Sequence, residues 1–193
     1  MTQILTGAAS TIPGFSSVNF DCSKLPSIIH YMQAAQGVVY GLGSKPLPLP
    51  ASPPEYAVAP NKPDPSCDCS GFARYVFWHA TNPDGKGGIE IPDGSVCQND
   101  WLAQNGFKHD AIPAPVPLYT NALNPNYVYL CFCRAGTRGE TIGHVWYVMF
   151  VHGQWWTFES HGGAGPSSRL ASTLILAHIC TDAYPIAVNN YGG

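Results

Sequence analysis

The chain has 193 residues, a length that predicts one domain over residues 1–193. Charged residues make up 11% of it and the formal net charge is −3, so its electrostatics give no reason to expect nucleic acid or an anionic membrane as partner. We find neither a signal peptide at the N-terminus nor an apolar run of membrane-spanning length. We therefore expect a cytoplasmic protein, or one that reaches its target by a non-classical route.

The N-terminal third predicts one helix and one long loop. Residues 24–36 carry an apolar stripe at helical spacing, and a glycine-rich turn over 37–43, with Tyr40 at its centre, follows. Residues 44–66 are rich in proline, which excludes a helix or a central strand. We expect an ordered loop inserted beside the functional site, either as a lid or as a wall that sets specificity, and the alternative is a passive linker.

The rest of the chain predicts two helices followed by a run of strands. The helices are expected over 69–80 and 95–104, each ended by an Asn-containing turn. Apolar, β-branched and aromatic residues predict strands over 127–134, 143–151, 154–161, 172–180 and 184–188. Helices that precede strands in this way favour an α+β fold with an antiparallel sheet.

Cys69 is the residue best placed for chemistry. It begins the helix predicted over 69–80 and follows Asp68, a residue type that caps helix N-termini. The positive end of the helix dipole favours the thiolate, which is the nucleophilic form of cysteine. Gly71 would let a substrate or another backbone segment approach the sulfur. The alternative is a buried, inert cysteine.

Two histidines are predicted to face each other across a hairpin. A two-residue turn at His152-Gly153 fixes the register of the flanking strands and places His144 opposite His161, on one face of the sheet. His144 could then accept the thiol proton of Cys69 while His161 orients its ring, as in a nucleophile–base–orienter arrangement. The alternatives are an exposed pair of histidines and a weak metal pair.

Metal and cofactor binding are not expected. In Cys67-x-Cys69 and Cys131-x-Cys133 a single residue lies between the two cysteines. Zinc sites usually have two to four residues between paired cysteines. The chain has seven cysteines, an odd number, so at least one thiol is unpaired or pairs with another chain.

The segment Asp68-Cys69-Ser70-Gly71-Phe72 resembles the nucleophile signature of the NlpC/P60 family of papain-like cysteine peptidases. Gly143-His144-Val145, followed by an aromatic-rich strand, resembles the base strand of that family. His161 fits its third polar position, and the turn over 37–43 resembles its aromatic turn. This likeness runs from about residue 27 to residue 161 and implies a papain-like fold, in which the nucleophile helix packs on an antiparallel sheet.

The resemblance also implies an activity. Family members are endopeptidases or amidases of bacterial peptidoglycan and commonly cut between D-glutamate and the diamino acid of the peptide stem. It implies that Cys69 is the nucleophile, His144 the base and His161 the orienter. Tyr40, Asp68 and Ser70 would bind the free N-terminal end of the stem, unless Asp68 only caps the helix. Such an enzyme would be a phage lysin or an injected antibacterial effector, the latter paired with an immunity protein.

Two other functions remain open from the sequence. One is a non-catalytic binding module on the same fold, although an intact set of Cys69, His144 and His161 argues against it. The other is a cysteine amidase or acyltransferase that uses the same residues on a substrate other than peptidoglycan.

Overall fold

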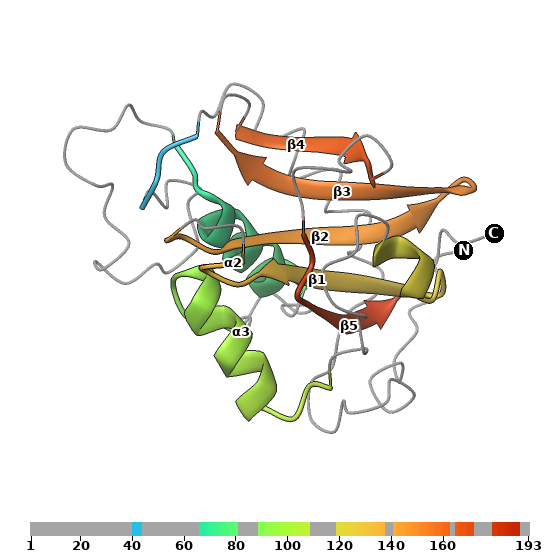
Figure 1. Ribbon diagram of the computed structural model, residues 1–193, viewed down its shortest axis with the longest axis horizontal. Helices are drawn as coiled ribbons and strands as arrows, with labels where there is room; N and C mark the ends of the chain where they lie inside the picture. The colour runs from blue at the N-terminus through green and yellow to red at the C-terminus, as the bar shows by residue number, and fades with distance from the viewer. Residues whose placement is uncertain are drawn as a thin grey trace.

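The computed structural model describes residues 40–43, 66–80, 89–108, 119–137, 141–162, 165–171 and 179–189. The helix predicted over 24–36 lies outside these residues, as does the proline-rich insertion predicted over 44–66 apart from its last residue. Within the described residues the chain forms two α-helices and a five-stranded antiparallel sheet (Figure 1). The predicted α+β class with an antiparallel sheet is therefore confirmed.

The elements follow one another along the chain as helices and then strands. The helices are α2 (Cys69–Ala80), α3 (Ser95–Gln104) and the short 3-10 helix η4 (Tyr119–Ala122). The strands are β1 (Tyr127–Cys133), β2 (His144–Val151), β3 (Gln154–His161), β4 (Gly165–Leu170) and β5 (Asp182–Val188). In the sheet they lie in the order β4-β3-β2-β1-β5, with antiparallel neighbours.

Most of these elements begin and end within two residues of the predicted bounds, but the strand after β3 does not. We predicted a strand over 172–180, whereas the structure places β4 at Gly165–Leu170. Of the predicted range only residues 179 and 180 are described, and neither is in a strand. The sequence of β4, GPSSRL, contains a proline and no β-branched residue. Such a sequence is tolerated because β4 is an edge strand that pairs with β3 alone.

The hairpin of β2 and β3 has the predicted two-residue turn. His152 and Gly153 both have positive φ angles, of 48° and 81°, as a tight turn between antiparallel strands requires. Val151 pairs with Gln154, and the same register continues to the pair of Tyr147 and Phe158. The turn therefore fixes which residues of the two strands share a face.

Helix α2 packs against β2 and β3 through an apolar face. Phe72, Val76 and Phe77 are buried in one cluster with residues of the sheet, including Tyr147 and Phe158. Each such side chain contributes roughly 1.5–3 kcal/mol through the area that it removes from water. The Tyr147 hydroxyl also donates a 2.7 Å hydrogen bond to the backbone oxygen of Ala73 in α2. This packing fixes the position of the helix relative to the strands that carry the histidines.

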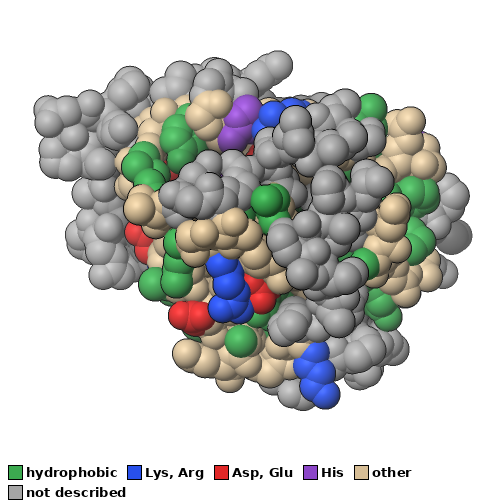
Figure 2. Space-filling model, viewed as in Figure 1, with side chains coloured by type: hydrophobic (Ala, Val, Ile, Leu, Met, Phe, Trp, Pro, Cys, Tyr) green, Lys and Arg blue, Asp and Glu red, His purple; other side chains and the backbone are tan. Residues whose placement is uncertain are grey.

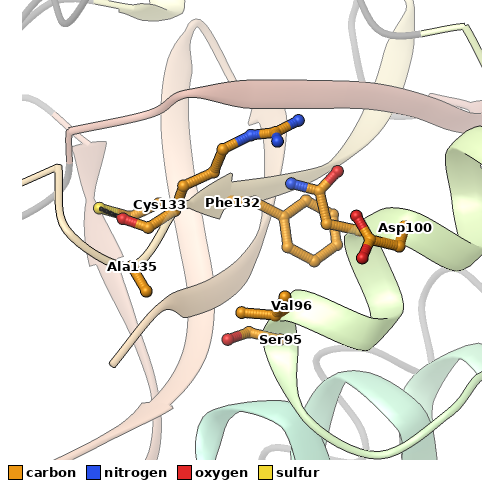
Figure 3. A pocket seen from close by; sticks show the side chains of 8 residues that line it. Ser95, Val96, Asp100, Phe132, Cys133 and Ala135 are labelled. Atoms are coloured by element: carbon orange, nitrogen blue, oxygen red, sulfur yellow. Dashed lines mark hydrogen bonds between the residues drawn. The ribbon is translucent and has the colours of Figure 1, made fainter. Parts of the chain in front are cut away.

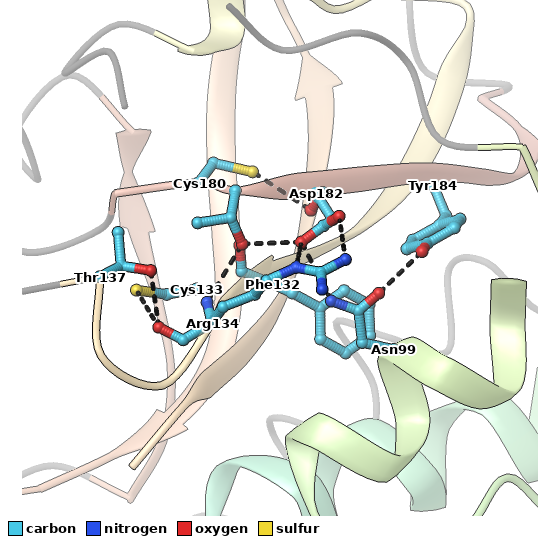
Figure 4. Close-up of polar contacts among 9 residues, drawn as sticks. Asn99, Phe132, Cys133, Arg134, Thr137, Cys180, Asp182 and Tyr184 are labelled. Atoms are coloured by element: carbon cyan, nitrogen blue, oxygen red, sulfur yellow. Dashed lines mark hydrogen bonds and ion pairs between the residues drawn. The ribbon is translucent and has the colours of Figure 1, made fainter. Parts of the chain in front are cut away.

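A polar network ties α3 and β5 to the end of β1 (Figure 4). Nε and one terminal nitrogen of Arg134 each donate to the buried carboxylate of Asp182 at 2.8 Å. Thr181 and Asn99 donate to the same carboxylate, and Asn99 accepts from the Tyr184 hydroxyl at 2.7 Å. Burial alone would raise the pKa of Asp182, but the hydrogen bonds from Arg134, Thr181 and Asn99 outweigh it and lower that pKa.

None of the helices in the described part of the chain is both long enough and apolar enough to cross a membrane. On the face drawn in Figure 2, the described Lys and Arg side chains lie in separate places and form no basic patch.

Replacing Arg134 with Gln should lower the free energy of unfolding at neutral pH by roughly 1–3 kcal/mol, because a buried carboxylate loses two of its donors. Since the pKa of Asp182 is lowered in the folded protein, its charge stabilises the fold above the ordinary carboxyl pKa. That contribution is lost as the pH falls through the lowered value, so the two proteins should converge in acid. Urea unfolding at neutral and acidic pH measures the difference, with the exposed Lys108→Gln as control. Equal stability at neutral pH would contradict the prediction.

Candidate active site

Cys69 is the first residue of α2, and Asp68 caps that helix. Oδ1 of Asp68 accepts a 2.7 Å hydrogen bond from the Gly71 N–H, and its backbone oxygen accepts one of 3.0 Å from the Phe72 N–H. This is the geometry of an N-cap residue, so the thiol of Cys69 sits at the positive end of the helix dipole. Cys69 is 7% exposed, which leaves its sulfur partly shielded from water.

The same carboxylate joins the turn around Tyr40 to the start of α2, next to Cys69. Oδ2 of Asp68 accepts a 2.9 Å hydrogen bond from the Gly43 N–H. The pKa of Tyr40 is raised to about 12, first by burial and then by the nearby Cys69 and Asp68. Tyr40 is therefore near enough to Cys69 and Asp68 for their charges to act on its phenol. The hydrogen bond to the Gly71 N–H shows that Asp68 caps the helix, which is one of the two roles that the sequence left open for it.

Ser70 is buried and stabilises the start of the helix through hydrogen bonds of its side chain and its backbone. Its hydroxyl donates to Oδ1 of Asp68 at 3.0 Å. Its backbone oxygen accepts a 2.9 Å hydrogen bond from the side chain of Gln98 in α3. From the sheet, the Ser160 hydroxyl donates to the backbone oxygen of Cys67 at 2.7 Å. The residues on both sides of Cys69 are thus bound to α3 and to β3.

His144 is the first residue of β2 and lies between Cys69 and an acidic side chain. Its Nε2 is 2.6 Å from Oε2 of Glu159, and its ring also makes a side-chain hydrogen bond with Cys69. Because Glu159 occupies Nε2, Nδ1 is the nitrogen left for the thiol. The ring of Trp146 stacks on the imidazole with centroids 5.4 Å apart and planes 22° apart. The imidazole is therefore fixed on three sides.

These contacts favour the imidazolium form of His144. Burial by itself lowers the pKa, but the hydrogen bonds and the attraction to Cys69 and Glu159 outweigh it and raise the pKa of His144 to about 9. At neutral pH the ring is therefore protonated, and a cation stands next to the sulfur. A cationic neighbour stabilises the thiolate of a cysteine.

The partner of Nε2 corrects one prediction. We expected His161 to orient His144, but Glu159 takes that position. Nδ1 of His161 contacts the backbone oxygen of Gly162 at 2.9 Å, and its Nε2 is buried with no hydrogen-bond partner among the described residues. The predicted register places Glu159 opposite Trp146, hence diagonal to His144, and a glutamate is long enough to reach across that diagonal. The signal was available: Glu159 is the sole acidic residue between positions 144 and 161.

Glu159 is fully buried and has partners for both oxygens. While Oε2 contacts His144, Oε1 accepts from a terminal nitrogen of Arg169 at 3.1 Å and from the Thr157 hydroxyl at 3.3 Å. Arg169 belongs to β4, the strand that the sequence did not predict, so its place in the site could not be expected either.

Gly143 connects the base strand to α3. A Cβ at this position would lie 2.9 Å from the backbone oxygen of Cys133 and 2.9 Å from Oγ of Ser95, so no larger residue fits. Beside it, a pocket of about 200 Å³ lies between α3 and the end of β1 (Figure 3). Cys133 lines this pocket and pairs with His144 in the sheet, but neither His144 nor Cys69 lines it.

Within the described ranges, no three His, Cys, Asp or Glu side chains are placed to bind a metal ion together. Comparison with known proteins adds no assignment, because no protein-family model and no curated protein matches the sequence.

Glu159→Gln should lower the pKa of His144 from about 9 toward the ordinary 6.5, by about one to two units, because the imidazolium loses its buried counter-charge. Ring-proton NMR against pH measures this value directly. The raised pKa of His144 also affects the stability of the folded protein. Protonated His144 stabilises the wild type at low pH, and this stabilisation is lost as the pH rises from about 6.5 through about 9. That loss should shrink in the variant. Glu90→Gln, whose carboxylate pairs with Arg74 instead, should leave the titration unchanged. An unshifted titration in Glu159→Gln would contradict the assignment.

Gly143→Ala should displace the start of β2, because the backbone oxygen of Cys133 cannot move aside as a flexible side chain can. We expect alkylation of Cys69 by iodoacetamide to slow by about 10- to 100-fold, as small misplacements of reacting groups do in enzymes. Gly162→Ala is the matched control, since a Cβ there meets no atom within 4 Å. The prediction fails if both variants react at the wild-type rate.

Proposed function

We propose that this protein is a cysteine hydrolase of the NlpC/P60 type, with a papain-like arrangement of helix and sheet over a single domain, that cleaves amide bonds in the peptide stems of bacterial peptidoglycan. The observation that carries the proposal is the contact between Cys69, at the start of a capped helix, and His144, whose other ring nitrogen is held by buried Glu159. An inert buried cysteine needs neither a neighbouring imidazolium nor a counter-charge behind it.

The reaction follows from the positions of these groups. The thiolate of Cys69 attacks the carbonyl carbon, and the pair of electrons of the C=O bond moves onto the oxygen. Backbone N–H groups at the start of α2 stabilise that oxyanion. When the C–N bond breaks, Nδ1 of His144 gives its proton to the leaving amine, and a thioester remains. Neutral His144 then takes a proton from water, whose oxygen attacks the thioester and releases the carboxylic acid. Glu159 stabilises each imidazolium state.

The choice of substrate rests on the segment around the nucleophile. The match of residues 68–72 to the family signature supports a stem peptide, with the bond between D-glutamate and the diamino acid as the first to test. Tyr40, half-buried near Cys69, offers a polar group at the edge of the site. The Asp68 carboxylate carries the negative charge that would attract the free ammonium group of the stem. We propose that the enzyme acts as a lysin or an injected antibacterial effector, and an effector would be restrained by an immunity protein.

Digestion of purified peptidoglycan tests the activity and names the bond. Wild-type protein should release fragments that carry a new amine, and their masses identify the bond that was cut. Cys69→Ala should release none, because no other group in the site can form the thioester. Cys67→Ala is the matched control, because it removes another buried sulfur two residues away and should leave the products unchanged.

Two results would overturn the proposal in different ways. If no fragments appear while Cys69 is alkylated rapidly at neutral pH, the activated thiol acts on another amide or acyl substrate. If no fragments appear, the thiol is unreactive and the protein still binds peptidoglycan, it is a binding module.

A further inference from the structure

Arg169 approaches the site from the far side of Glu159. It lies on β4, where it pairs with Thr157 of β3 in the register of the two strands. A terminal nitrogen of its guanidinium is 3.1 Å from Oε1 of Glu159. Its side chain is 33% exposed, whereas that of Glu159 is 0% exposed. The arginine therefore connects a fully buried carboxylate to the surface of the sheet.

A carboxylate buried as deeply as Glu159 is stabilised by a second cation, on the side away from His144. Burial disfavours the charged form, so without compensation the group would hold a proton near neutral pH. Thr157 offers only a neutral hydroxyl, at 3.3 Å. Arg169 supplies a permanent charge, and its bond to Oε1 also sets the rotation that directs Oε2 at His144.

We propose that Arg169 is a positioning residue of the hydrolase, which keeps Glu159 ionised and directed at His144, so that charges of alternating sign run from Arg169 through Glu159 and His144 to Cys69. The four residues come from β4, β3, β2 and α2, and their contacts connect each to the next. This inference rests on the proposed use of Cys69 and His144, but it concerns a residue that touches neither the sulfur nor the substrate.

Two other titratable residues lie near these four, Tyr40 and His161, and neither supplies the cation that Arg169 gives to Glu159. Tyr40 is close enough to Cys69 and Asp68 for their charges to raise its pKa to about 12, and that raised pKa keeps it neutral. His161 is two residues along β3 from Glu159, but its Nδ1 contacts a backbone oxygen and its Nε2 has no hydrogen-bond partner in the described part of the chain. Arg169 is thus the cation that the structure pairs with Glu159 on the side away from His144.

The sign of the effect follows from charge alone. In the state that the proposed reaction uses, Glu159, His144 and Cys69 together hold a single proton, on the imidazole, and the positive charge of Arg169 favours that state. Without it, the same three residues carry an uncompensated negative charge and retain a second proton to higher pH. Whether that proton sits on Glu159 or on the sulfur, fewer molecules contain the thiolate–imidazolium pair at a given pH. The pH at which the thiol becomes reactive should therefore rise.

The pH dependence of Cys69 alkylation by iodoacetamide tests this directly, with modification read by peptide mass spectrometry. Cys97, which is exposed on α3, serves as an internal reference in the same sample. In Arg169→Gln and Arg169→Met the acid limb of the Cys69 profile should move up by about one pH unit. Arg169→Lys keeps the charge and should lie close to the wild type. Arg134→Gln breaks another pair of an arginine with a buried carboxylate, between the residue after β1 and the first residue of β5, and should lower stability without moving the acid limb.

The outcomes separate this inference from the proposed function. If folded Arg169→Gln or Arg169→Met has the same acid limb of Cys69 alkylation as the wild type, Arg169 has only a structural role and the inference is overturned. If Cys69 of the wild type reacts no faster than Cys97 at any pH, the proposed function is overturned as well. The readout requires no substrate, so failure to digest peptidoglycan leaves the result for Arg169 intact.

Discussion

The carboxylate of Asp68 is the constraint on which the site depends. It caps α2, binds the Ser70 hydroxyl and binds the backbone of the turn that carries Tyr40. A helix start has several N–H groups without partners inside the helix. Here one of them is satisfied by Asp68, so that the following residue, Cys69, lies at a rigid position with the dipole behind it. Asp68 therefore holds the thiol at the start of the helix, while Ser160 and Tyr147 of the sheet hold the helix itself in place.

The sheet supplies the second half of the site through charge. His144 stands at the beginning of β2, where a strand end can meet the start of α2, and the buried Glu159 keeps it protonated. Neither charge would be stable at this depth alone, because a lone buried ion pays a large desolvation penalty. Each charge is stable because the side chain that it contacts carries the opposite charge. The electrostatic environment of the thiol therefore extends across β2, β3 and β4.

The parts of this arrangement that the sequence predicted are those with local signals. The cap at Asp68, the turn signal that ends α2 and the turn at His152-Gly153 each lie within a few residues of the feature that they determine. Glu159 was missed because the choice of partner on a sheet face depends on how far a side chain reaches, and opposition across the strands favoured His161. Arg169 could not be assigned at all, since β4 lacks the residue pattern of a strand and exists because β3 offers it a partner.

The tight turn between β2 and β3 has a consequence for the chemistry at the opposite end of the hairpin. Successive residues of a strand point to opposite faces, so one residue added at His152-Gly153 would exchange the faces of every residue in β3 relative to β2. Phe158 or Ser160 would then occupy the face of Glu159, and the imidazole would lose its counter-charge although no residue of the site had changed. The length of this loop is therefore as strict a requirement for an active thiol as the identity of the base.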